Sequence, residues 1–265
     1  MGSASAITSS DPFARRFALT AAERRAALVV YITAGHPDME RSLELLRALP
    51  SAGADIIEVG VPFSDPMADG PIIQASSQRA LEQGMTFDRV LALVRDARVD
   101  VPMVLFTYLN PLLTAGEDAL DRAHDAGVSG LLVTDLPLGA DRELEERFAR
   151  GPLSFVRLVA PTTPADRMAE IATHGGGFVY LISRLGVTGV RNDVPIELPA
   201  TIRMLRAATA LPICVGFGIS TPAQARAVAA MADGVVVGSA VVRAADQSPG
   251  AAIELVGQLR AALDR

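Results

Sequence analysis

The chain has 265 residues, of which 50% are hydrophobic and 20% are charged, and its net charge is −6. This composition excludes a disordered or collagen-like protein, and the scattered basic residues form no stripe for binding nucleic acid. No apolar run reaches the roughly 18 residues of a membrane-spanning helix, and the first residues lack the apolar stretch of a signal peptide.

Eight short apolar runs, rich in β-branched residues, recur at the spacing of βα units. They predict strands over 27–33, 55–61, 102–109, 130–136, 154–160, 177–183, 212–218 and 234–242. Helical patterns lie between them, over 38–49, 87–97, 117–125, 140–149, 165–173, 221–230 and 250–263. Asp38 and Thr221, each with a proline beside it, are predicted N-cap or first-turn residues.

The order of these elements predicts an α/β fold, specifically a TIM (β/α)8 barrel. Strands that are apolar on both faces suit a parallel sheet covered by helices, and eight βα units fit into about 250 residues. A doubly wound sheet would carry a G-x-G-x-x-G turn after its first strand, but residues 34–37 read AGHP. We expect a single domain over 1–265, an extra N-terminal helix over 8–25 that caps the barrel, and a flexible N-terminus over 1–10.

Residue types exclude some chemistries. All 24 basic residues are arginine, so the chain has no lysine for a Schiff base or for anchoring pyridoxal phosphate. The three histidines, His36, His124 and His174, stand apart from one another, and no metal site is predicted. The single cysteine, Cys214, allows no internal disulfide, so we expect a cytoplasmic location.

The second predicted strand places an acidic side chain where a barrel enzyme keeps its active site. Period-two alternation puts Glu58 on the face opposite Ile57 and Val59, and therefore inside the barrel near its mouth. Burial there raises a carboxyl pKa toward values useful for proton transfer. A purely structural ion pair is the alternative, but no lysine exists and no arginine is predicted at neighbouring strand ends.

The loop after this strand contains two further acidic residues, Asp65 and Asp69, among prolines and a glycine. Functional residues often lie on such shaped loops over a barrel mouth. Asp-Pro and Asp-Gly pairs are also ordinary turn sequences. The residues alone leave both readings open for each aspartate.

Glycines gather where the last three predicted strands end, in 184–189, 216–220 and 237–240. Barrel loops after strands seven and eight commonly bind phosphate through backbone N–H groups, and glycine permits a close approach. A single glycine there indicates little, because glycines often end strands. Three such loops in succession predict a phosphorylated substrate.

Four segments resemble the α subunit of tryptophan synthase: 31–35, 58–71 (EVGVPFSDPMADGP), 183–189 and 216–220. The similarity runs in consistent order from about Phe13 to the C-terminus. It implies a lyase of L-tryptophan biosynthesis that performs a retro-aldol cleavage of indole-3-glycerol phosphate to indole and glyceraldehyde 3-phosphate. It also implies a β-subunit partner in an α2β2 assembly, with pyridoxal phosphate in the β subunit and no cofactor in this chain.

The same resemblance assigns residue roles. It implies that Glu58 and Asp69 are catalytic. The other positions carried over are Gly189, Gly218, Gly238 and Ser239 for phosphate, Tyr31, Phe106, Tyr180, Thr188 and Phe217 for the substrate pocket, and Asp65, Asn110 and Pro137 for the partner interface. Three positions depart from the usual family pattern: His36, Val30 and Leu109.

Other readings remain open on the sequence. One is another phosphate-binding barrel that acts as an isomerase or synthase on a phosphorylated ribose derivative. A second is a barrel kept only as a binding or activating subunit, and a third is a lyase that releases indole without a β partner. An indole-release assay with and without a β subunit separates these hypotheses.

Overall fold

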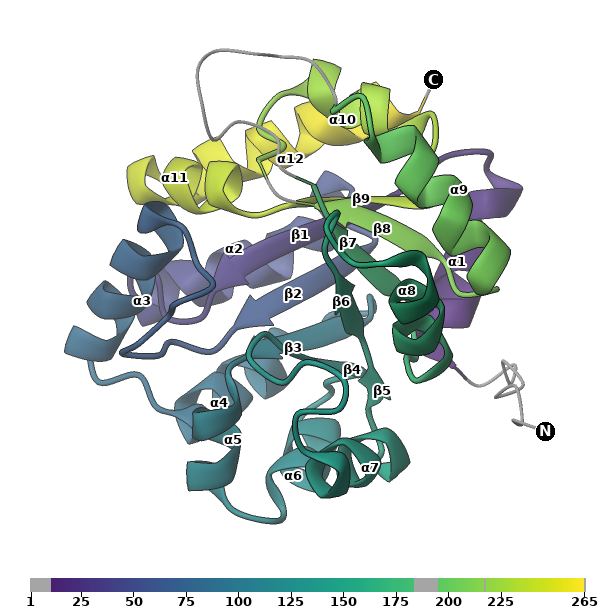
Figure 1. The fold of residues 1–265 in the computed structure, drawn as a ribbon. Helices are drawn as coiled ribbons and strands as arrows, with labels where there is room; N and C mark the ends of the chain where they lie inside the picture. Colours follow the sequence, from purple (N-terminus) through teal and green to yellow (C-terminus); the bar gives the residue numbers. More distant parts are fainter. Residues whose placement is uncertain (1–10, 184–194, 217, 265) are drawn as a thin grey trace.

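The computed structural model describes residues 11–183, 195–216 and 218–264 (Figure 1). In these residues all strand pairings are parallel, and the nine strands form one sheet in the order β5-β4-β3-β2-β1-β9-β8-β7-β6. The strands are β1 (Ala27–Thr33), β2 (Ile56–Gly60), β3 (Met103–Thr107), β4 (Gly130–Val133), β5 (Ser154–Phe155), β6 (Arg157–Val159), β7 (Val179–Ile182), β8 (Ile213–Gly216) and β9 (Gly234–Val237).

The sheet closes on itself through its two outermost members. β5 pairs with β4, β6 pairs with β7, and only Val156 separates β5 from β6 along the chain. The single strand predicted over 154–160 is therefore two short segments that share its pairing between the two neighbours. With that correction the eight predicted strands form the expected TIM barrel, and the prediction of the fold class is confirmed.

Helices surround the strands in the described part of the chain (Figure 1). They are α1 (Pro12–Ala22), α2 (Met39–Ala52), α3 (Pro71–Glu82), α4 (Phe87–Ala97), α5 (Leu109–Ala115), α6 (Ala119–Asp125), α7 (Arg142–Arg150), α8 (Ala165–Thr173), α9 (Leu198–Ala208), α10 (Pro222–Ala229), α11 (Ser239–Gln247) and α12 (Pro249–Leu263). The predicted N-caps are confirmed, since the Asp38 side chain accepts from the N–H of Arg41 and Thr221 forms a capping box with Gln224.

Several predicted strands extend past the observed ends; the fourth, predicted over 130–136, ends at Val133, and two others run into helices. The eighth was predicted over 234–242, but β9 ends at Val237 and α11 begins at Ser239; the third was predicted to reach Leu109, where α5 begins. Both continuations are apolar because α11 buries Val241 and Val242, and because Tyr108, the N-cap residue of α5, is buried. A short apolar run cannot by its pattern alone be assigned to a strand or to a buried helix.

Helix α1 closes the end of the barrel opposite the mouth, as predicted. The rings of Phe13 and Phe17 lie 5.9 and 6.1 Å from the ring of Phe178, just before β7, and all three are buried. They belong to the same apolar cluster as inward-facing residues of the strands, such as Val29 and Val104. The interior is therefore a packed core rather than a channel.

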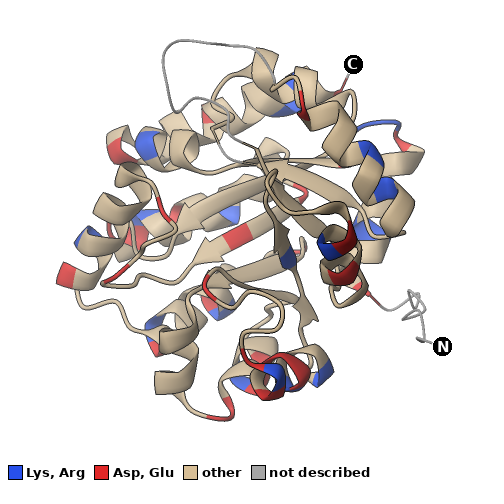
Figure 2. Ribbon diagram, viewed as in Figure 1, with Lys and Arg blue, Asp and Glu red and all other residues tan. Residues whose placement is uncertain are grey.

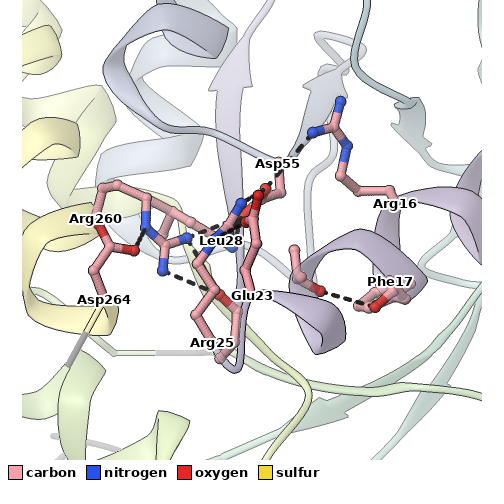
Figure 3. Close-up of polar contacts among 10 residues, drawn as sticks. Arg16, Phe17, Glu23, Arg25, Leu28, Asp55, Arg260 and Asp264 are labelled. Carbon is pink, nitrogen blue, oxygen red and sulfur yellow. Dashed lines mark hydrogen bonds and ion pairs between the residues drawn. The ribbon is translucent and has the colours of Figure 1, made fainter.

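A buried carboxylate ties both ends of the chain to this closed end (Figure 3). Asp55, which precedes β2, accepts two hydrogen bonds from Arg25, at 2.7 and 3.0 Å, and one from the Arg260 guanidinium, at 3.0 Å. The backbone N–H of Leu28 donates to it at 2.9 Å, and Arg16 of α1 lies 3.9 Å away. Because the Asp55 side chain is only 3% exposed, these partners offset the cost of burying its charge.

Charged residues lie mostly on the outer helices and connecting loops, while the strands are nearly free of them (Figure 2). This distribution agrees with a sheet that is buried on both faces. Of the helices that the structure describes, none combines the length and the apolar character needed to cross a membrane.

Candidate active site

Glu58 lies inside the barrel, on the middle residue of β2. It is in register with Tyr31 of β1 and Val104 of β3, and it is 1% exposed. Its neighbours Ile57 and Val59 pack instead in the layer between strands and helices. The alternation predicted from the sequence therefore matches the structure at this position.

The carboxyl group of Glu58 is buried in the barrel interior. Neither of its oxygen atoms has a hydrogen-bond partner among the described residues. Desolvation by burial raises its pKa from 4.5 to about 8, so the group keeps its proton at neutral pH. A purely structural carboxylate would need cationic or hydrogen-bonding partners, such as those around Asp55.

Asp69 projects from the loop that joins β2 to α3. Its Oδ2 atom accepts a hydrogen bond of 3.0 Å from the hydroxyl of Tyr108, and its backbone carbonyl accepts one of 2.9 Å from Gln74. Burial raises the pKa of Asp69 to about 6, while the Tyr108 hydrogen bond lowers it. With a pKa of about 6, Asp69 is mostly ionised at neutral pH.

Aromatic side chains surround the space next to Glu58. The rings of Tyr31 and Phe106 meet edge to face at 5.2 Å, and the hydroxyl of Tyr31 lies against Gly60, where any Cβ atom would collide with it. Tyr180 on β7 lies close enough to Glu58 that the carboxylate raises the tyrosine's pKa, after the larger effect of burial. The structure therefore brings these three predicted pocket residues together around one buried carboxyl.

The predicted phosphate residues that the structure describes lie on adjacent loops. Gly218 follows β8 and Gly238 follows β9, and these two strands pair directly. Gly218 has a φ of +84°, a conformation that favours glycine. Helix α11 begins at the exposed Ser239 with Gly238 as N-cap and no side-chain cap, so its first N–H groups are free of a capping side chain. Gly189, Thr188 and Phe217 lie outside the described residues.

The predicted partner residues share one rim of the barrel. Asp65, Asn110 and Pro137 are all exposed, and they follow β2, β3 and β4, which are neighbours in the sheet. The carboxyl ends of parallel strands meet at one edge, so these residues are on the same side as Asp69. Met67, in the loop of Asp65, is 87% exposed.

Sequence reasoning assigned no role to Tyr108, which donates to Asp69. A usable signal was its position at the end of the third strand, one of the strand ends that face the mouth.

The comparisons with known proteins agree with this geometry. The chain matches the profile of the family described as tryptophan synthase alpha chain over residues 17–263. The chain belongs to this family. It is 46% identical over 254 residues to the tryptophan synthase alpha chain of Synechococcus elongatus, covering 94% of this chain and 96% of that protein. The corresponding protein of Prochlorococcus marinus is 47% identical over 247 residues, with 91% and 90% covered.

Solved structures give the same result. A crystal structure of tryptophan synthase from M. tuberculosis, the ligand-free form of a TrpA mutant, superposes with a TM-score of 0.87 at 34% identity, covering 96% of this chain and 99% of that one. Tryptophan synthase subunit alpha from Legionella pneumophila superposes with the same TM-score of 0.87 at 36% identity, covering 97% and 99%. Like its family, the chain is a lyase of tryptophan biosynthesis that cleaves indole-3-glycerol phosphate. The family pairs with a β subunit, which holds the pyridoxal phosphate, and its own reaction requires no cofactor.

Proposed function

We propose that Glu58 and Asp69 divide the work of the cleavage reaction between them. The observation that carries this assignment is that the barrel holds one carboxyl group buried without a described partner and a second one hydrogen-bonded on the loop above. Their environments give them different pKa values, about 8 for Glu58 and about 6 for Asp69. Two carboxyl groups with separated pKa values are suited to separate acid and base roles.

Glu58 is the proton carrier in this proposal. Protonated at neutral pH, it donates its proton to C3 of the indole ring, which converts the ring to an indolenine leaving group. The resulting carboxylate then accepts the proton of the hydroxyl on the adjacent side-chain carbon. As that carbon becomes the aldehyde of glyceraldehyde 3-phosphate, the bond to C3 breaks and its electron pair returns to the indole ring. The proton taken up restores Glu58.

Asp69 stabilises charge on the substrate and does not transfer a proton at the bond that breaks. Ionised, it accepts the hydrogen bond of the indole N–H and stabilises the positive charge that develops on this nitrogen when C3 is protonated. The walls of the pocket are Tyr31, Phe106 and Tyr180, with Thr188 and Phe217 assigned from the sequence alone.

The phosphate group binds, in this proposal, at the loops after β8 and β9. Two features support this placement. The positive φ of Gly218 marks a backbone turn that an anion could approach closely, and the start of α11 at Gly238 and Ser239 has N–H groups without a capping side chain. Gly189 joins them on sequence evidence. A helix N-terminus also carries a partial positive charge that favours a phosphate.

The chain acts, we propose, as one domain over 1–265 in the cytoplasm and within an α2β2 assembly. The exposed rim of Asp65, Asn110 and Pro137 would contact the β subunit beside the loop that carries Asp69. Contact at this place would let a partner influence the active-site loop.

Indole release from indole-3-glycerol phosphate tests the proposal, with the chain alone and after addition of a tryptophan synthase β subunit. We expect measurable indole release by the chain alone and faster release in the complex. Asp65→Arg should reduce the gain that the β subunit causes and leave the release by the chain alone unchanged. No release in either mixture contradicts the assignment of the two carboxylates. Release that the β subunit leaves unchanged contradicts the partner face.

A further inference from the structure

Tyr108 contacts the Asp69 loop at three points. Its hydroxyl donates to Oδ2 of Asp69 at 3.0 Å and accepts from the backbone N–H of Ala68 at 2.9 Å. Its ring lies 5.1 Å from the ring of Phe63, near the other end of the same loop. One side chain therefore contacts the loop near its beginning and again at its functional carboxylate.

Tyr108 is itself held firmly by the barrel. It is 3% exposed and directly follows Thr107, which is in register with Val133 of β4. It is the N-cap residue of α5, and the next backbone N–H, that of Leu109, donates to the carboxylate of Asp135 at 2.7 Å. Tyr108 therefore connects the paired strands β3 and β4 to the loop that carries Asp69, and it restrains the position of this loop.

We propose that Tyr108 is a positioning residue for the cleavage reaction, whose hydroxyl holds the Asp69 carboxylate in place and in its ionised form. The inference rests on the role proposed for Asp69. It assigns Tyr108 no contact with the reacting bond. A hydrogen bond donated to a carboxylate favours the charged form, and the N–H of Ala68 fixes the direction in which the hydroxyl points.

The hydrogen bond has a consequence for pH dependence. Burial raises the pKa of Asp69 to about 6 and the Tyr108 hydroxyl opposes that rise, so removing the hydroxyl moves the pKa further up. Among the described residues, the other titratable groups that interact with Asp69 are Tyr31 and Tyr180, whose pKa values burial also raises, so both stay neutral through this range. Glu58 titrates separately, near pH 8.

Tyr108→Phe tests the proposal because it removes the hydroxyl and keeps the ring that packs on Phe63. In the pH profile of kcat/KM for indole release, we expect the pKa of the acidic limb to shift upward by about one unit. A hydrogen bond to a charged group stabilises the charged form by an amount that corresponds to roughly this shift. The basic limb, set by Glu58, should stay in place. Activity near pH 6 then falls about fivefold, and about tenfold well below pH 6. Much of it returns as the pH approaches the basic limb.

Two further measurements keep the test decisive. Adding Tyr108→Phe to Asp69→Asn should lower the remaining turnover by less than about twofold, because the hydroxyl acts through the carboxylate. A 13C titration of the Asp69 carboxyl, identified by its absence in Asp69→Asn, should show the same upward pKa shift in Tyr108→Phe without relying on turnover.

The outcomes distinguish a failure of the role proposed for Tyr108 from a failure of the role proposed for Asp69. The role of Tyr108 is overturned if Tyr108→Phe shifts neither the acidic limb nor the carboxyl titration. It is also overturned if Tyr108→Phe lowers turnover by the same factor whether position 69 is Asp or Asn. If Asp69→Asn itself keeps the turnover of the unsubstituted chain, the proposed function fails at Asp69, whatever Tyr108→Phe does.

Discussion

Replacement of Glu58 by glutamine removes the proton carrier while preserving its shape. With a pKa of about 8, roughly nine in ten Glu58 side chains are protonated at pH 7 and ready to donate. General acid–base catalysis typically contributes about 10²- to 10⁴-fold, and a group acting on both sides of one broken bond belongs at the upper end. We therefore expect indole release to fall about 10⁴-fold, equivalent to about 5 kcal/mol of activation free energy.

The assay is indole release at saturating indole-3-glycerol phosphate, together with the affinity for a non-cleavable analogue. Analogue affinity should change little, because the amide fills the volume of the carboxyl group. Glu44→Gln, an exposed carboxylate on α2, is the matched control and should keep full turnover. If Glu58→Gln retains more than about a tenth of the original rate, the loss lies below even weak acid–base effects, and Glu58 is not the proton carrier.

The pH dependence of the free energy of unfolding gives an independent check of the burial of Glu58. Above pH 4.5 the unfolded chain releases the Glu58 proton, whereas the folded chain holds it until about pH 8. The folded state then binds more protons, so this group makes the free energy of unfolding fall as the pH rises through that window. Between pH 5 and pH 7 the loss is about 2–3 kcal/mol. In urea unfolding, Glu58→Gln should lack this contribution; identical pH dependence in both proteins would show that Glu58 is not desolvated.

Three other substitutions test the remaining assignments. Asp69→Asn should lower indole release about 10²- to 10³-fold, as loss of transition-state charge stabilisation does, with analogue affinity nearly unchanged; a normal rate would remove Asp69 from the mechanism. Gly218→Val should weaken a phosphate-ester analogue far more than free indole in calorimetric titration, and equal losses would misplace the phosphate. Asp55→Asn should lower the free energy of unfolding by about 3 kcal/mol, because it leaves Arg25 and Arg260 without their shared buried carboxylate. A change below about 1 kcal/mol in urea unfolding would mean that this cluster is not stabilising.

Much of the architecture could be predicted from local pattern. The first strand was predicted over its observed bounds, 27–33, because a short apolar run rich in β-branched residues lies there. The break in the strand over 154–160 could not be predicted in this way. It arises where β5 and β6 share their pairing between two neighbours, and that pairing is a property of barrel closure.

The amino-acid sequence by itself determined which face of β2 carries Glu58, since alternation along a strand depends only on the strand's own residues. It also placed Asp69, Gly218 and Gly238 after strands whose ends meet at one mouth. Tertiary structure alone decided what surrounds them. Tyr108 reaches Asp69 from 39 positions away, and Arg260 reaches Asp55 from 205 positions away. Such contacts depend on strand register and helix packing across the whole barrel, and the pKa values of the two carboxyl groups follow from the burial and hydrogen bonds that this packing creates.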